Sequence, residues 1–321
     1  MDGIYIIIIF KISNYPAKYI SLSIFRLCMI NYYDRARTQP EVFKQLFCKE
    51  LLFVYYDCPL GSNRQDSWSQ CNFILYVVTG KKIFYADGKT WMLTTGSAVF
   101  IKKGACFIEK VDGEVLCLMA FFIPDDYLRG FMLQHHSLSH KGAAGVASKN
   151  LVIPLEVNET MLAYYDSVIP YFSSQIKPPE DLLELKFKEL LFNIVGNPAN
   201  NELTDYLHTL VLPQANNIQP IIEANCCFNL TLEDYAKLCN RSLSSFKRDF
   251  QKIYGEPPAH WLLNKRLDNA MQLLVGSDKS INDISFESGF ENSTHFSRVF
   301  KNRYGLPPLQ YRLKKSTITQ V

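Results

Sequence analysis

The chain has 321 residues, of which 48% are hydrophobic and 20% charged, a composition that excludes a disordered or fibrous chain and fits a globular protein of two domains. Its net charge of +3 is unevenly divided: residues from Pro213 onward carry 14 Lys and Arg against 10 Asp and Glu, and the residues before carry 20 against 21. A basic surplus of this size agrees with a nucleic-acid partner but does not by itself indicate one.

The first predicted segment is an N-terminal extension, residues 1–37. Its apolar run, Ile4–Phe10, covers only seven residues and follows Asp2 rather than a basic stretch. A membrane-spanning helix needs about 20 apolar residues, so neither a signal peptide nor membrane association is expected. Either the extension belongs to the protein or translation starts at Met29.

A regulatory domain is expected over residues 38–212, and its first part has the pattern of short strands. The apolar or alternating runs are Leu51–Tyr56, Phe73–Val78, Lys82–Tyr85, Ala98–Ile101, Cys106–Lys110 and Val115–Phe122. Turn dipeptides separate them, at Thr79-Gly80, Asp87-Gly88, Lys103-Gly104 and Asp112-Gly113. This spacing predicts a small antiparallel barrel or sandwich. Its interior is either filled by side chains or hollow and open to an apolar effector.

The strand region lacks the residues of a metal or phosphate site. No histidine lies between Met1 and Gln134, whereas a metal-dependent barrel enzyme needs two or more histidines and a carboxylate that project inward from the strands. The cluster His135, His136 and His140 follows the strands in a Gly/Ala/Ser-rich loop and is interpreted as a solvated loop. Asp87-Gly88-Lys89-Thr90 lacks the first glycine of a phosphate-binding loop, so we interpret it as a hairpin turn. No metal, cofactor or catalytic residue is predicted.

The nine cysteines occur without a Cys-x-x-Cys spacing and in an odd total. We therefore expect a reduced chain in the cytoplasm, with residues such as Cys106, Cys117 and Cys239 serving as small apolar side chains.

Amphipathic patterns predict helices after the strands, over Thr160–Ser173, Asp181–Val195 and Glu202–Leu212. In the helix predicted over Asp181–Val195, five residues belong either to the core of the domain or to a dimer surface. They are Leu182, Leu185, Lys186, Glu189 and Phe192. Residues 213–217 are interpreted as a linker between domains.

The residues from 218 to 316 contain one pattern twice, before a tail at 317–321. When the sequence is shifted by 50 residues, Phe246–Phe250 aligns with Phe296–Phe300. The same shift aligns Tyr254-Gly255 with Tyr304-Gly305 and the Pro-Pro pair at 257 with the pair at 307. Capping signals begin the units, at Thr231 with Asp234 and at Ser280 with Asp283. Each copy is predicted to be a helix-turn-helix unit, and the first has Cys239-Asn240-Arg241 where the second has a glycine turn.

A helix is predicted between the two units, because Leu263, Leu267, Ala270 and Leu274 repeat at helical spacing up to Gly276. About 17 residues at 1.5 Å each give roughly 26 Å. This length would hold two recognition helices near the spacing of successive major grooves, which is roughly 34 Å.

These residues resemble the AraC/XylS family of bacterial transcription regulators. The resemblance covers about a hundred residues and is carried by the paired units, by Gly289-Phe290, by the run Phe296–Lys301 and by the ending Gly305–Arg312. The strand region resembles the cupin-like sensory domain found in front of many such units. A weaker resemblance, in Tyr76–Gly80, Gly96–Gly104 and Leu185–Phe192, is to the branch of ExsA-like type III secretion activators, whose front domain is controlled by partner proteins.

The fold implied is α+β, with a cupin-like β-barrel or sandwich followed by helices and an all-α DNA-binding domain of two joined helix-turn-helix units. The family implies double-stranded promoter DNA and RNA polymerase as partners, and a homodimer, small-molecule effector or regulatory protein acting on the front domain. The side chains opposite the buried stripes are the predicted DNA contacts: Arg241, Ser244, Ser245, Lys247, Arg248, Ser293, Thr294, His295, Ser297, Arg298 and Lys301. A solvated helix face is the alternative for these residues.

The function predicted is a sequence-specific transcription regulator, an activator in the commoner case, that inserts two helices into adjacent major-groove segments. The alternatives are a cupin-like small-molecule-binding protein or enzyme fused to a DNA-binding domain, and a protein-interaction module whose basic helices bind an acidic partner.

Overall fold

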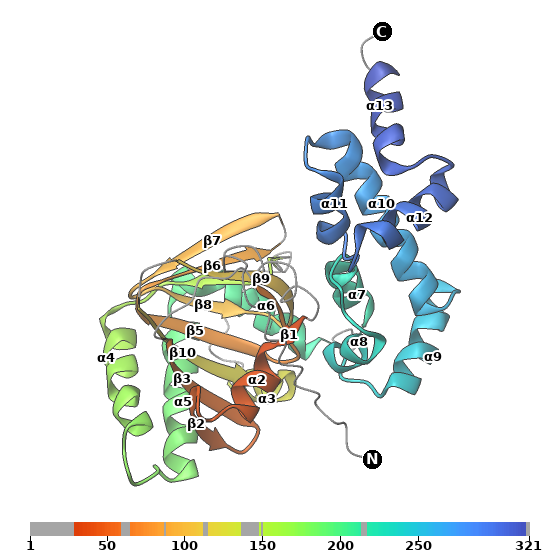
Figure 1. The fold of residues 1–321 in the computed structure, drawn as a ribbon. Helices are drawn as coiled ribbons and strands as arrows, with labels where there is room; N and C mark the ends of the chain where they lie inside the picture. The colour runs from red at the N-terminus through yellow and green to blue at the C-terminus, as the bar shows by residue number, and fades with distance from the viewer. Residues whose placement is uncertain are drawn as a thin grey trace, which may run out of the picture.

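Two stacked β-sheets form the N-terminal half of the chain and a group of helices forms the C-terminal half (Figure 1). The computed structural model describes residues 29–58, 65–86, 88–111, 115–135, 148, 150–212 and 217–318. The predicted α+β class is confirmed. The predicted turn at Asp112-Gly113, His136 and His140, and all but Asn217 of the expected linker lie outside the described residues.

The larger sheet has six strands in the order β11-β8-β5-β10-β3-β2. Its strands are β2 (Phe43–Cys48), β3 (Leu51–Cys58), β5 (Asn72–Thr79), β8 (Ala98–Ile101), β10 (Leu116–Ile123) and β11 (Val152–Leu155). All its neighbouring strands pair antiparallel. Four of these strands match sequence predictions, because each is a continuous apolar run.

The smaller sheet has five strands in the order β1-β4-β9-β6-β7. They are β1 (Ile30–Asn31), β4 (Gln65–Ser69), β6 (Lys81–Ala86), β7 (Lys89–Thr94) and β9 (Gly104–Lys110). Within the expected N-terminal extension, β1 and the helix α2 (Tyr32–Thr38) belong to the fold: β1 pairs with β4, and Tyr32 and Ala36 are buried between the sheets.

The six-stranded sheet is buried on both faces, because alternate side chains enter two separate cores. In β10, Leu118, Ala120 and Phe122 point between the sheets. Met119 and Phe121 point the other way, under the helices α3 (Asp125–Gln134), α4 (Glu159–Val168), α5 (Glu180–Val195) and α6 (Asn201–Val211). The short 3-10 turns η2 (Ile169–Phe172) and η3 (Pro198–Asn200) join these helices. Strand alternation therefore supplies both layers of the domain.

Side chains fill the space between the sheets. The cavity bounded by Tyr32, Phe84 and Ile101, among others, measures about 10 Å³. A cavity of this size holds at most one water molecule. Of the two interiors considered from the sequence, the filled one is observed in this region.

The described residues from 217 to 318 form the helices α7 (Gln219–Asn225), α8 (Leu232–Leu238), α9 (Leu243–Tyr254), α10 (Pro258–Gly276), α11 (Ile281–Glu287), α12 (Ser293–Tyr304) and α13 (Pro308–Ile318). Helices α8 and α9 make the first helix-turn-helix unit, α11 and α12 make the second, and α10 connects them (Figure 1). Phe246, Phe250, Phe296 and Phe300 are fully buried in two cores.

The turns of the two units share one backbone conformation but differ in length. Asn240 has φ +52° and Gly289 has φ +82°, and the next residue in each case donates its amide to a helix carbonyl, Arg241 to Ala236 at 2.9 Å and Phe290 to Ser285 at 3.0 Å. Asn240 therefore takes the left-handed position of Gly289, which asparagine tolerates better than most residues. The second turn is longer by a single residue, since α8 and α11 begin at Leu232 and Ile281 but α9 and α12 begin at Leu243 and Ser293.

The C-terminal helices pack against the smaller sheet at its strands β4 and β9. Trp68 of β4 and Ala105 of β9 are buried in the same core as Tyr235 and Phe246 of the first helix-turn-helix unit. The Ala105 amide donates to Asn225 Oδ1 at 2.7 Å, and the rings of Phe107 and Phe228 lie 5.3 Å apart. Residues 225–228 thus form the main link between the two halves.

Candidate nucleic-acid interface

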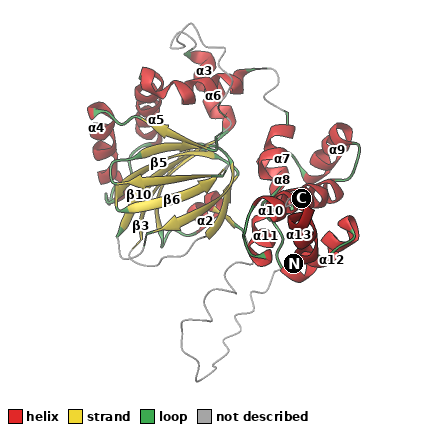
Figure 2. Cartoon of the chain, turned by 90° about the horizontal axis from the view of Figure 1, so that it is seen from above, coloured by secondary structure: helices red, strands yellow, loops and turns green. Residues whose placement is uncertain are grey.

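Helices α9 and α12 lie on the side of the C-terminal domain that faces away from the sheets (Figures 1 and 2). Contacts with the sheet domain come from α7, α8 and the segment that follows α7, and the buried side of α9 shares the core that contains Trp68 and Ala105. The outer sides of the predicted recognition helices face away from the regulatory domain.

In the first unit, the exposed face of α9 carries Ser244, Lys247 and Arg248. The Arg248 side chain is 69% exposed and lies 3.4 Å from the Ser245 hydroxyl, its Nη2 donating. Ser245 is half-buried. These side chains leave a polar and basic surface on one side of the helix.

Arg241 differs from the other predicted contacts in the first unit. It is half-buried, and its Nε donates to Asp249 Oδ2 at 3.4 Å. This ion pair ties the turn to α9, so Arg241 has a position in the unit that does not depend on DNA.

In the second unit, Thr294, His295, Arg298 and Lys301 are exposed on α12, while Ser293 and Ser297 are half-buried. The ring of His295 lies 6.2 Å from the ring of Phe290 in the turn. None of the ion pairs among the described residues engages Arg298 or Lys301. Both cations can therefore reach a ligand without breaking a charge pair.

Each recognition helix begins with a capping side chain. Ser242 Oγ accepts the amide of Ser245 at 3.3 Å, and Asn292 Oδ1 accepts the amide of His295 at 2.7 Å. Other amides of the first turn still point along the helix axis, where they attract anions such as a DNA phosphate. This geometry accounts for the polar residues near the start of both helices.

The orientation of α12 depends on residues that sequence reasoning missed. Arg303 Nη2 donates to Asp268 Oδ1 of α10 at 2.7 Å, and the Tyr304 hydroxyl donates to the same oxygen at 2.9 Å. Burial, with the hydrogen bond to Asp268, raises the pKa of Tyr304 to about 12, so the hydroxyl keeps its proton. No local pattern indicates this pairing, because its partners are 35 residues apart.

Arg266 of α10 binds three carbonyl groups from separate segments. It donates to Cys226 at 3.0 Å and Phe228 at 2.7 Å after α7, and to Gly289 at 3.1 Å in the second turn. One guanidinium therefore connects the segment at the domain junction to the unit that carries α12.

The described residues contain no group of three or more His, Cys, Asp or Glu side chains able to hold a metal ion. His135, which ends α3, packs its ring 4.8 Å from those of Phe131 and Phe192. None of the helices in the described ranges combines the length and the apolar character needed to cross a bilayer.

Comparison with known proteins gives two family matches. Residues 72–206 match the family described as ExsA N-terminal regulatory domain, and residues 235–314 match a helix-turn-helix domain family.

Three curated relatives align over most of their length. The chain is 26% identical to the thermoregulatory protein LcrF of Yersinia pestis and 24% identical to the virulence regulon transcriptional activator VirF of Yersinia enterocolitica. Each of these alignments covers 76% of this chain and 90% of the relative. It is 25% identical to the HTH-type transcriptional regulator ExsA of Pseudomonas aeruginosa, over 75% of this chain and 86% of that protein.

Proposed function

Because the chain belongs to the AraC/XylS family of helix-turn-helix DNA-binding transcription regulators, we propose that it inserts α9 and α12 into two successive major-groove segments. The observation that carries this proposal is the repeated position of Arg248 and Arg298. Each lies on the exposed face of its helix, two residues after a buried phenylalanine.

The length of α10 supports binding to two grooves at once. Its 19 residues span about 28 Å at 1.5 Å per residue. Successive major grooves on one side of B-DNA lie about 34 Å apart. A connector of this length holds the two recognition helices at nearly the required separation.

We assign different roles to the predicted contacts. Arg248 and Arg298 are the candidates for reading a guanine edge, and Lys247 and Lys301 are the candidates for phosphates. The short side chains on the same faces permit close approach and add hydrogen bonds: Ser244, Ser245, Ser293, Thr294, His295 and Ser297. For Arg241 the ion pair with Asp249 supports a positioning role within the turn and, at most, a phosphate contact.

The sheet domain regulates through its outer surface in this proposal. The space between the sheets is filled, which favours a regulatory protein or a second copy over a small effector bound inside. The relatives of this chain are named as regulators, which favours a regulatory role for the sheet domain over a catalytic one.

A homodimer through α5 is the oligomeric state we propose. Leu185 and Phe192 lie seven residues apart, on one face of that helix, and are 64% and 39% exposed. Lys186 and Glu189 pair with each other beside them at 2.9 Å. Leu182 is half-buried, so the predicted surface is part core and part exposed.

Activation through contact with RNA polymerase in the cytoplasm completes the proposal, in keeping with a relative named as an activator. Transcription in vitro with purified polymerase tests it: the full chain should raise the yield from a promoter that it binds, and Arg298→Ala should lose this effect. A lower yield with the wild-type chain would identify a repressor.

A further inference from the structure

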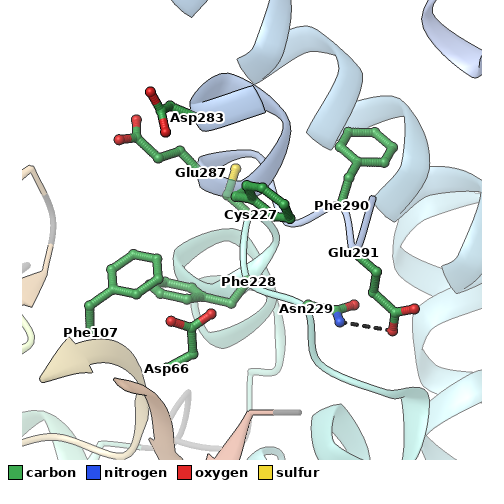
Figure 3. Close-up of a pocket in the computed structure, with 10 residues that line it drawn as sticks. Asp66, Phe107, Cys227, Phe228, Asn229, Asp283, Glu287, Phe290 and Glu291 are labelled. Carbon is green, nitrogen blue, oxygen red and sulfur yellow. Dashed lines mark hydrogen bonds between the residues drawn. The ribbon is translucent and has the colours of Figure 1, made fainter. Parts of the chain in front are cut away.

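Cys226 and Cys227 are neighbours in the chain whose sulfur atoms lie 3.8 Å apart. Both are half-buried. Cys227 also lines a cavity of about 90 Å³ between the two halves of the chain, together with Phe107, Phe228 and Glu287 (Figure 3). The cavity gives a small reagent access to Cys227, and the partial exposure of Cys226 gives access to the other sulfur atom.

We propose that Cys226 and Cys227 form a reversible disulfide on oxidation by a peroxide and that this bond weakens DNA binding. The inference rests on the proposed function for its effect on DNA, although the chemistry at the dithiol stands apart from it. No part of the recognition surface contributes a reacting atom.

The surroundings of Cys226 favour its reaction. The hydrogen bond from Cys227 lowers the pKa of the Cys226 thiol, and the charges of Lys265 and Arg266 act in the same direction. Burial opposes this lowering at Cys226 without reversing it, whereas at Cys48, Cys71 and Cys239 burial is the largest influence and raises the thiol pKa. In its thiol form Cys226 donates to the Glu223 carbonyl at 3.3 Å. Because the thiolate is the nucleophile, Cys226 reacts ahead of these other cysteines.

The oxidation proceeds in two balanced steps. The Cys226 thiol loses its proton, the thiolate attacks one peroxide oxygen, and the O–O bond breaks as the sulfur becomes a sulfenic acid. The hydroxide that leaves takes up the proton from the Cys226 thiol and forms the first water. Cys227 sulfur then attacks Cys226 sulfur, the S–O bond breaks, and the departing hydroxide takes the Cys227 proton to form water. Two thiols and one peroxide thus give one disulfide and two waters.

Closing this bond must move the peptide group between the two cysteines. Adjacent Cα atoms are about 3.8 Å apart. The Cα atoms of a disulfide usually lie farther apart, at roughly 4.4–6.8 Å, and no rotation can lengthen the separation of neighbouring residues. Bringing the sulfur atoms from 3.8 Å to the bonded distance of about 2.05 Å within this short ring therefore requires the peptide group between them to rotate from its present orientation. The carbonyl on that peptide group is the Cys226 acceptor of Arg266 Nε. Rotation therefore breaks one of the three hydrogen bonds that hold Arg266.

The second helix-turn-helix unit is in contact with this segment. A Cβ atom placed on Gly289 would lie 2.6 Å from the Cys227 carbonyl oxygen, so the two backbones touch. The Gly289 carbonyl also accepts from Arg266. A displaced Cys226–Phe228 segment thus shifts the turn that positions α12, and it also loosens the Asn225 contact with the Ala105 amide.

The test uses the full chain, reduced and then treated with hydrogen peroxide. Peptide mass analysis should find a loss of two hydrogens in the peptide that contains both cysteines. Hydrogen exchange at the Ala105 amide should accelerate, and affinity for a duplex DNA site should fall about tenfold, as expected for one lost hydrogen bond. Dithiothreitol should reverse all three changes.

Variants identify the residues responsible. Cys227→Ser and, independently, Cys226→Ser should abolish the peroxide effect on exchange and on DNA affinity, whereas Cys117→Ser, on β10, should respond as the wild type does. A peptide oxidised only to sulfinic acid would overturn the proposal, and so would a disulfide that leaves both Ala105 exchange and DNA affinity unchanged. If the reduced chain bound no DNA, the proposed function would fail. Peptide mass analysis would still show whether the disulfide forms, and hydrogen exchange at the Ala105 amide would still show whether the contact between the two halves loosens.

Discussion

At the scale of single residues, the recognition surface is basic but lightly charged, and its cations differ in their surroundings. Arg298 and Lys301 form no ion pair within the part of the chain that the structure describes, whereas Arg248 lies 3.9 Å from Asp249. A cation that breaks no existing pair on binding contributes more to affinity. We therefore expect the second unit to contribute more binding free energy than the first.

The first prediction concerns Arg298. Arg298→Ala should weaken binding to a preferred duplex by roughly 1 to 3 kcal/mol and relax preference at one base pair, because a base-reading side chain is lost. Lys301→Ala should weaken binding to all duplexes alike and make its salt dependence shallower. Fluorescence anisotropy at several salt concentrations measures both, with Lys44→Ala in the sheet domain as the control. Unchanged affinity and preference for Arg298→Ala would remove this residue from the interface.

A second prediction compares the two turns. Gly289→Ala should destabilise the chain by more than the roughly 1 to 2 kcal/mol typical of a left-handed L-residue, because the added Cβ also meets the Cys227 carbonyl at 2.6 Å. Asn240→Gly should leave stability unchanged or raise it, because glycine adopts that conformation freely. Denaturant unfolding measures both free energies. Equal effects of the two substitutions would contradict the assignment of the turns.

Sequence reasoning placed Arg248 and Arg298 on the outer faces of their helices, where the structure has them exposed, but it did not indicate the residues that orient these helices. Helical spacing separates Arg248 from Phe250 whatever the partner, so outward positions follow from the pattern alone. The Arg303 pair with Asp268 and the three acceptors of Arg266 depend on packing between distant segments. Gln251, also exposed on α9 at the position equivalent to Lys301, is not among the predicted contacts.

At the scale of elements, each recognition helix is held by a pair of aromatic rings. Phe246 and Phe250 lie 5.7 Å apart in the first unit, and Phe296 and Phe300 lie 5.4 Å apart in the second. All four are fully buried. Ile253, at helical spacing from Phe246 and Phe250, is instead 43% exposed, whereas the neighbouring Tyr254 packs its ring against Phe250 and Trp261.

The third prediction concerns these cores. Phe250→Ala and Phe300→Ala should each lower the free energy of unfolding by about 3 to 5 kcal/mol, because each leaves a cavity in a small domain. Ile253→Ala should change it by no more than about 0.5 kcal/mol, as expected at an exposed site. Thermal and denaturant unfolding measure the differences. A normal melting temperature for either phenylalanine variant would refute the assignment of the buried faces.

The sequence predicted strands whose own residues are apolar. It did not predict strands whose polar residues are buried by neighbouring elements. Strands such as β5 and β10 are continuous apolar runs, because both of their faces are buried. Strand β4 reads Gln-Asp-Ser-Trp-Ser, and its burial comes from β9, β1 and the C-terminal helices. A polar strand of this kind has no periodic signal in its own residues.

At the scale of the whole molecule, the C-terminal domain has its own cores but shares one of them with the sheet domain. Trp68 and Ala105 are buried against the first helix-turn-helix unit, and Lys237 pairs with Asp34 at 3.3 Å. The sequence predicted two domains and a linker. It could not predict this junction, since no residue pattern near Trp68 indicates a partner outside the sheet.

The fourth prediction follows from the shared core. A fragment covering residues 217–321 should fold and bind DNA, because Phe246, Phe250, Phe296 and Phe300 remain buried within it. The melting temperature of the fragment should lie several degrees below that of the same domain in the full chain. The expected difference is on the order of 4 to 8 °C for each kcal/mol of stabilising free energy lost with the junction contacts. Calorimetry on both proteins measures the shift. A fragment that matched the full chain would show that the junction adds no stability.

DNA binding by this chain, as proposed, depends on two recognition helices that read two groove segments. Hydroxyl-radical footprinting of the full chain tests this most directly, on a duplex that the chain has selected from random sequences. Two protected segments about one helical turn apart are expected. Arg248→Ala should weaken protection mainly in one segment and Arg298→Ala mainly in the other, with both variants folded. A single protected segment, or equal loss from both segments in either variant, would contradict it.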